Sequence, residues 1–182
     1  MRSRIDSDTT LRSVEITDAD ALFLVVDGHR SHLGAWLPWV DQTRSANDTR
    51  AFIETSIENE KNGTGLAAII EKRGEICGVV GLDSIDVKNR SSHIGYWLRE
   101  DVQRLGLATR AVACLTEYGF SALGLNRLDI RAAPENHRSR AVAERLGFRE
   151  EGILREAERH GDRFTDLVSY SLLRREHENC KR

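Results

Sequence analysis

The spacing of hydrophobic and polar positions changes about a third of the way along the chain. The first part begins with a strand-like segment at 9–16, after which the pattern predicts helices over 21–26, over 29–36, and from Ser45 or Asn47 to Gly63. In the third of these, Phe52, Ile53 and Ile57 share one apolar stripe. From residue 65 onward, runs of β-branched and other apolar residues predict strands instead.

The second part reads as six strands with two helices between them. We expect strands at 65–70, 76–85, 91–99, 127–132, 148–155 and 165–173, a turn at 73–75, and polar connections at 86–90 and 156–163. The helices cover about 108–122 and 137–146 and end at glycines. Since the unit 91–133 runs strand–helix–strand, it supplies one parallel pair in an otherwise antiparallel sheet. The class is therefore α+β, and 1–182 reads as a single domain without a linker or repeat.

Composition excludes several classes of partner. The chain has 182 residues, 40% of them hydrophobic and 31% charged, and its net charge is −2. That balance gives no electrostatic case for binding nucleic acid. No apolar run approaches the length of a membrane span, so we expect no membrane partner and a cytoplasmic protein. The sequence leaves the oligomeric state open, a homodimer included.

Cysteine and histidine do not gather into a ligand set. Cys77, Cys114 and Cys180 are too few and too scattered for a disulfide framework or a zinc site. The first two lie in apolar surroundings and are expected in the core. The six histidines are dispersed as well, and we therefore expect no metal.

The segment Gln103–Ala108 carries the most specific chemistry. It follows a predicted strand and opens a predicted helix, with Gly106 and Ala108 at the helix mouth. Small residues there leave backbone N–H groups uncovered at the positive end of the helix dipole, which favours a phosphate or pyrophosphate. Neither the dinucleotide fingerprint nor the Walker loop is present.

This Q-x-x-G-x-A loop resembles that of the GNAT N-acetyltransferases, which holds the pyrophosphate of acetyl-CoA. Other segments resemble the ribosomal-protein-serine/alanine N-acetyltransferase branch, namely Leu33–Trp39, Leu125–Leu128, Glu135–Ser139, Glu144–Phe148 and Glu151–Gly152. The resemblance covers nearly the whole chain. It implies the GNAT fold, a mixed and mostly antiparallel sheet with one splayed parallel strand pair, flanked by helices.

The resemblance also implies how acetyl-CoA, as cosubstrate, would bind. Its pantetheine arm would lie between the splayed strands 91–99 and 127–133, and its thioester beside Leu98 and Arg99, where a backbone N–H could polarise the carbonyl. Asn136 would cap a helix and contact the arm. The pyrophosphate would bind backbone N–H groups of the loop and helix start, formed by Gln103, Arg104, Leu105, Gly106, Leu107, Ala108 and Thr109.

In that branch, Ser139 would lie near the CoA sulfur and protonate the departing thiolate, and Glu158 would accept a proton from the amine through water. Tyr170 is a substitute acid, because a tyrosine has this role in other GNAT enzymes. Trp36 and Trp39 would cover the acceptor entrance, although two aromatics so close together are as often a core plug. A helix-capping serine and a surface glutamate are the plainer interpretations of Ser139 and Glu158.

The expected reaction is direct transfer of an acetyl group to a primary amine. An α-amine has a pKa near 8 and a lysine about 10.4, so at neutral pH far more of the α-amine is unprotonated. This favours the N-terminal α-amine of a (ribosomal) protein. Two alternatives stay open: acetylation of a small amine such as a polyamine, amino acid or aminoglycoside, and a non-catalytic acyl-CoA-binding sensor.

Overall fold

The computed structural model describes residues 1–179, so Cys180 lies outside the described part of the chain. One sheet runs through the molecule in the order β1-β2-β3-β4-β5-β6-β8-β7. Its strands are β1 (Arg2–Arg4), β2 (Thr9–Ser13), β3 (Leu66–Lys72), β4 (Glu75–Asp86), β5 (Ser91–Leu98), β6 (Arg127–Ala132), β7 (Arg149–His160) and β8 (Arg163–Leu173). Only β5 and β6 pair in parallel among the described strands, which confirms the predicted α+β class and its mixed sheet.

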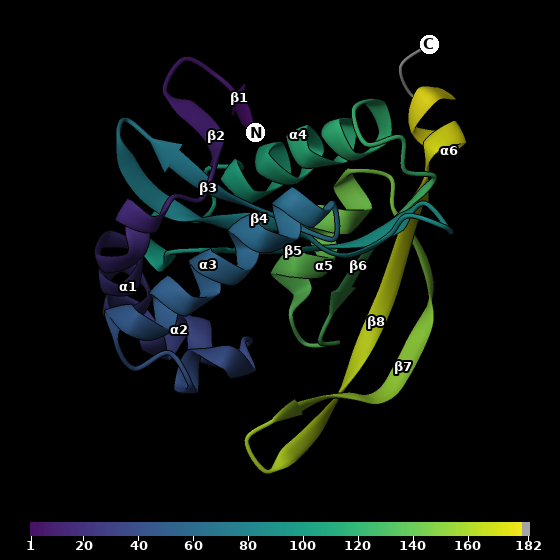
Figure 1. Cartoon of the computed structure of the whole chain (residues 1–182). Coiled ribbons are helices and arrows are strands. Elements are labelled where there is room, and N and C mark those ends of the chain that lie inside the picture. Colours follow the sequence, from purple (N-terminus) through teal and green to yellow (C-terminus); the bar gives the residue numbers. More distant parts are fainter. Residues whose placement is uncertain (180–182) are drawn as a thin grey trace.

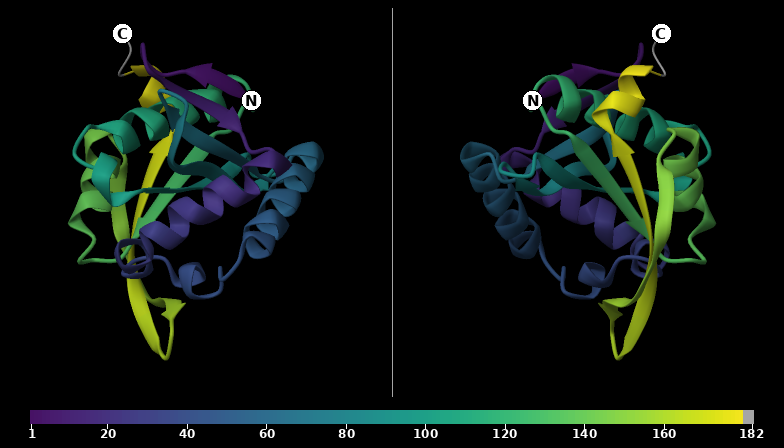
Figure 2. Two further views of the ribbon diagram at one scale, coloured as in Figure 1. Left: turned by 90° about the vertical axis from the view of Figure 1, so that its left-hand side faces the viewer. Right: turned by 90° about the vertical axis from the view of Figure 1, so that its right-hand side faces the viewer.

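Helices cover both faces of this sheet (Figures 1 and 2). They are α1 (Ala19–Gly28), α2 (Arg30–Gly34), α3 (Ala46–Asn62), α4 (Leu107–Ser121), α5 (His137–Arg145) and α6 (Arg174–Asn179), with short 3-10 turns η1 (Ile16–Asp18), η2 (Pro38–Asp41) and η3 (Glu100–Val102). The predicted helix start at Ser45 is correct, because the Ser45 and Asp48 side chains form a capping box there. Among the described residues, no helix is long and apolar enough to span a membrane.

Strand alternation divides the core between the two faces. Ala67, Ile69 and Val79 pack with α1 and α3 residues on one face, whereas their neighbours Ala68, Ile70 and Val80 pack with α4 on the other. Successive side chains of one strand thus belong to different clusters. Because of this alternation, only every second side chain of a strand faces a given side of the sheet.

The parallel pair opens after three residues. Ser91–His93 of β5 pair with Arg127–Asp129 of β6, and no further pairs form although β5 continues to Leu98 and β6 to Ala132. The resulting gap is the splay that the family resemblance implies. Backbone groups on the facing edges beyond His93 have no partner from the opposite strand.

The C-terminal part differs from the sequence-based prediction. The segment 156–163 is not a connection: β7 continues to His160, β8 begins at Arg163, and the two form a long hairpin that projects beyond the rest of the sheet (Figure 1). Three large hydrophobic side chains are exposed on this hairpin, those of Ile153, Leu154 and Phe164. The polar composition of this hairpin resembles that of a loop, because little of the hairpin packs against a core. The pattern also missed β1 and α6.

Candidate active site

A cavity of about 630 Å³ lies where β5 turns away from β6. Its walls come from the loop before α4, the start of α4, the first turns of α5, β5 and α2. Much of the predicted cofactor site lies here: Leu98, Gln103, Arg104, Gly106, Leu107, Ala108, Thr109, Asn136 and Ser139 all line the cavity. Leu105 and Arg99 do not belong to this lining set.

The start of α4 is built to receive an anion. Gly106 is the helix N-cap with a φ of 70°, a left-handed conformation that glycine adopts without strain, and no side chain caps the helix. The first N–H groups of a helix have no partner within it, so those after Gly106 remain available to a ligand. Arg104 has a φ of 64° and also contributes to this turn. The local backbone therefore fits a pyrophosphate.

Gln103 links the two sides of the cavity. Its side-chain nitrogen contacts Nε2 of His32, and its Oε1 accepts a hydrogen bond of 2.6 Å from Arg138. An amide nitrogen can only donate, so the His32 Nε2 must be an acceptor and the ring neutral. Burial lowers the pKa of His32, which favours the same state.

The cavity has a cationic rim that the sequence analysis missed. Arg138 and Arg145 of α5 line it together with Arg104, and Arg145 also lies 3.5 Å from the Thr109 hydroxyl. Residues seven apart lie on one face of a helix, so the spacing of these two arginines was a usable signal. Positive side chains in this position would neutralise phosphate charge.

The predicted thioester position requires one correction. The backbone N–H of Arg99 donates to the Cys77 carbonyl at 2.9 Å, and the Arg99 side chain pairs with Glu75 and Asp101. Arg99 therefore has no free backbone N–H for a ligand. Because successive N–H groups of a strand point to opposite edges, the N–H of Leu98 faces the gap toward β6. Of the two predicted residues, Leu98 is thus the one whose N–H is open to a ligand there.

Ser139 is held between a helix cap and a tyrosine. Asn136 accepts a 3.1 Å hydrogen bond from the Ser139 backbone N–H, which confirms its predicted capping role. The Ser139 hydroxyl lies 2.8 Å from the Tyr96 hydroxyl, which also donates to the Ser139 carbonyl at 3.1 Å. Burial raises the pKa of Tyr96 to about 12, so the phenol stays protonated.

The sequence matches the Acetyltransferase (GNAT) domain family over residues 8–149. It is 36% identical to the N-acetyltransferase YdaF of Bacillus subtilis over 179 residues, 98% of each chain. It is 27% identical to the ribosomal-protein-serine acetyltransferase of Escherichia coli, covering 93% of this chain and 95% of that protein. The solved structure of the alpha-N-protein acetyltransferase RimL with coenzyme A superposes with a TM-score of 0.92 at 25% identity, covering 95% and 98% of the two chains.

The chain is a GNAT acetyltransferase. Its fold and its relatives make it an acetyl-CoA-dependent acyltransferase. No group of three or more potential metal ligands occurs between residues 1 and 179.

Tyr170 of this GNAT acetyltransferase does not line the 630 Å³ cavity that holds most of the predicted cofactor residues, which we call the cofactor cavity. It is 1% exposed, accepts a 2.8 Å hydrogen bond from Arg140 and contacts Glu144 and Glu150. The tyrosine that contacts Ser139 is Tyr96 of β5. Both tyrosines lie in strands. Which of them can approach Ser139 depends on which strand borders the gap between β5 and β6.

Glu158 does not join Ser139 within the cavity. It lies on the projecting β7–β8 hairpin opposite Thr165, is half-buried, and lines neither this cavity nor a second one beside α3. Burial raises the pKa of its carboxyl, opposed by the charge of His160. The predicted base is thus on a different element from the predicted acid.

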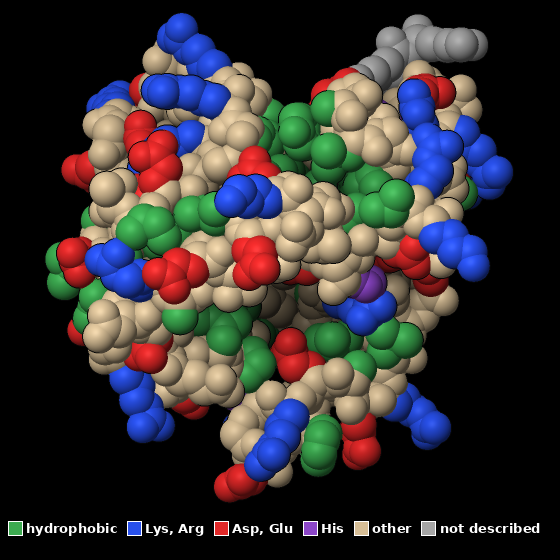
Figure 3. All heavy atoms as spheres, in the orientation of Figure 1, with side chains coloured by type: hydrophobic (Ala, Val, Ile, Leu, Met, Phe, Trp, Pro, Cys, Tyr) green, Lys and Arg blue, Asp and Glu red, His purple; other side chains and the backbone are tan. Residues whose placement is uncertain are grey.

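The two tryptophans separate onto different surfaces. Trp36 lines the cofactor cavity, while Trp39 lines a second cavity and lies 6.0 Å from Trp97, centroid to centroid. The face seen in Figure 3 is hollowed near its centre, above the β7–β8 hairpin, and hydrophobic side chains border the hollow.

Proposed function

We propose that this enzyme acetylates the N-terminal α-amine of a protein, with a ribosomal protein as the acceptor. The observation that supports acyl transfer most directly is the Ser139 hydroxyl, which borders the cofactor cavity and is hydrogen-bonded to Tyr96. Near full-length likeness to a protein named ribosomal-protein-serine acetyltransferase supports the acceptor class. The acceptor chemistry agrees, since an α-amine with a pKa of about 8 needs less help to lose its proton than a lysine.

Each part of the site has a role in this proposal. The N–H groups at the start of α4 and the arginine rim bind the pyrophosphate, and the gap between β5 and β6 takes the pantetheine arm. The N–H of Leu98 donates to the thioester carbonyl as negative charge develops on it. Ser139 protonates the departing CoA thiolate. Glu158 serves as the water-mediated base, for which its raised pKa is suited.

We extend the proposal to the whole chain and its setting. All of β8, and β7 after its first residue, lie beyond the matched range 8–149. Because β8 pairs with every residue of β6, we treat 1–182 as one domain. A ribosomal-protein acceptor places the enzyme in the cytoplasm.

Peptide acetylation tests the proposed acceptor. We expect a peptide with a free N-terminal serine or alanine to be acetylated, and its Nα-blocked version with an internal lysine to be unreactive. Mass spectrometry of the product locates the acetyl group. Acetyl found on lysine, or reactivity confined to small amines such as spermidine, would refute the N-terminal assignment while leaving the acetyltransferase assignment intact.

A further inference from the structure

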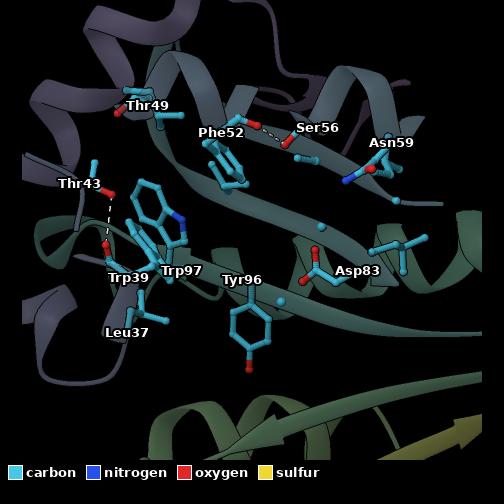
Figure 4. A pocket seen from close by; sticks show the side chains of 18 of the residues that line it. Leu37, Trp39, Thr43, Thr49, Phe52, Ser56, Asn59, Asp83, Tyr96 and Trp97 are labelled. Atoms are coloured by element: carbon cyan, nitrogen blue, oxygen red, sulfur yellow. Dashed lines mark hydrogen bonds between the residues drawn. The ribbon is translucent and has the colours of Figure 1, made fainter. Parts of the chain in front are cut away.

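A second cavity, of about 450 Å³, lies on the opposite face of the sheet from α4. It is enclosed by α1, η2 and α3 and by the central strands β3, β4 and β5 (Figure 4). Its floor is a row of small residues across three strands, because Ala67 pairs with Gly81 and Gly81 pairs with Gly95. Directly paired residues of antiparallel strands point to the same face, so the hollow follows from the register.

The two glycines of this row cannot be replaced by larger residues without disturbing their surroundings. A Cβ added at Gly81 would lie 2.7 Å from the Leu66 carbonyl oxygen, which is backbone and cannot move away easily. A Cβ at Gly95 would lie 3.0 Å from Oδ2 of Asp83. Glycine at these two positions thus keeps the space open and leaves the Asp83 carboxylate room above β5.

The cavity combines apolar walls with one charge. Trp39, Phe52 and Trp97 supply aromatic surface, and Asp83 is the one acidic or basic residue among those that line the cavity. Asp83 is accessible within the hollow although protein atoms surround it, and this burial raises its pKa. Figure 4 shows its carboxylate beside the cavity, between α3 and the ring of Tyr96.

Thr49 leaves one polar group beside the cavity without a partner. It is 3% exposed, lines the cavity, and its hydroxyl has no hydrogen-bond partner. A buried hydroxyl without a partner costs free energy, and such groups are rare in folded proteins.

The two cavities meet at β5. Leu37, Tyr96 and Trp97 line both of them, and the Tyr96 hydroxyl points from this junction toward Ser139. A ligand in the second cavity therefore lies against the same strand, β5, that borders the place where the acetyl group is expected.

We propose that this cavity binds the acceptor, with Asp83 attracting its ammonium group before transfer and an apolar side chain from its first two residues over the Ala67–Gly81–Gly95 row. The inference rests on the proposed function and names the acceptor class more narrowly: an α-amine next to a large apolar side chain. The negative charge matches the ammonium, and the aromatic walls match the side chain. The cavity would disfavour acceptors that are acidic at these two positions.

Two peptide series test the side-chain preference. Each varies one residue, the first or the second, among Phe, Leu, Ser and Asp in an otherwise constant short peptide. Burial of a large apolar side chain should raise kcat/KM by roughly tenfold or more over Asp at one of the two positions. Equal kcat/KM across both series, with acetyl still on the N-terminus, would overturn the inference and leave the proposed function standing.

Variants locate the preference in the cavity. Ala67→Leu fills the floor and should abolish the Phe advantage with an unchanged affinity for CoA, whereas Ala51→Leu on the exposed side of α3 should retain it. Asp83→Asn should lower kcat/KM roughly tenfold to a hundredfold, mainly through KM. Glu54→Gln, an exposed charge change on α3, is the matched control.

A binding measurement separates this inference from the proposed function. With CoA present, calorimetry of a Phe-first peptide amide should show binding that Ala67→Leu and Asp83→Asn each weaken. If such binding occurs but the acetyl group is found on lysine, the cavity assignment stands and the N-terminal function fails. If the peptide binds both variants as tightly as the parent enzyme, the acceptor lies elsewhere and the inference is wrong.

Discussion

Removing the Ser139 hydroxyl should slow acetyl transfer without unfolding the enzyme. The helix cap at this position uses the Ser139 backbone N–H, donated to Asn136, and Ser139→Ala retains it. The loss to stability is then one neutral hydrogen bond, the 2.8 Å contact with Tyr96, or about 1 kcal/mol. General acid catalysis contributes about a hundredfold to ten-thousandfold, or roughly 3 to 5 kcal/mol of barrier. The effect on kcat should thus exceed the effect on folding.

Tyr96 makes a double-mutant cycle informative. Tyr96→Phe keeps the ring that borders both cavities and removes only the hydroxyl. If the two hydroxyls act as one unit, the double variant should be no slower than Ser139→Ala, because the tyrosine acts through the serine. Its pKa of about 12 means that no change in Tyr96 ionisation should appear between pH 6 and about 10.

The assay is release of the CoA thiol, measured at saturating acetyl-CoA and peptide, together with CoA affinity by calorimetry. We expect a large loss in kcat and little change in CoA affinity. An unchanged kcat in Ser139→Ala would return this residue to a capping role. Fully additive losses in the double variant would show that Tyr96 and Ser139 act independently, which would contradict the proposed unit.

Three further predictions follow from residues outside this pair. Gly106→Glu should reduce CoA binding at least tenfold, since it places like charge at the pyrophosphate site and strains a φ of 70°; calorimetry that showed parent-like affinity would move the site elsewhere. Because burial raises the pKa of Glu158, its ionised form is lost as pH falls through a value above the ordinary one. Glu158→Gln should remove the acidic limb that this titration gives the kcat/KM profile, and the loss of rate in the variant should shrink as pH rises toward the pKa of the amine. A pH-independent loss of rate would exclude Glu158 as the base. Thr49→Val should raise the free energy of unfolding in urea by up to about 1 kcal/mol, because it removes an unpartnered buried hydroxyl; a loss of stability would mean that the hydroxyl has a partner in solution.

Local chemistry explains which parts of the fold were predictable. The start of α4 needs a residue with positive φ, and the start of α3 needs a capping side chain, so Gly106 and Ser45 mark these positions in the sequence. Such requirements act within a few residues. The class of fold and the proposed pyrophosphate loop follow from them, helped by the family resemblance.

Long-range register explains what was missed. The small-residue floor exists only because Gly81 pairs with both Ala67 and Gly95, and an irregularity between Ile70 and Glu71 shifts the β3–β4 register. No periodic pattern reveals such a bulge. The same limitation concealed Tyr96, whose contact with Ser139 joins residues 43 positions apart.

The early separation of β5 from β6 gives this protein two strand edges inside its sheet. Exposed edges normally invite pairing with another chain, and proteins usually confine them to the margins and protect them there. In the binding mode proposed above, the cosubstrate covers both edges. Mass action then links folding to acetyl-CoA supply, so that a ligand at 100 times its Kd adds roughly 2.7 kcal/mol of apparent stability. A cell short of acetyl-CoA would hold this enzyme in its least stable and most aggregation-prone form.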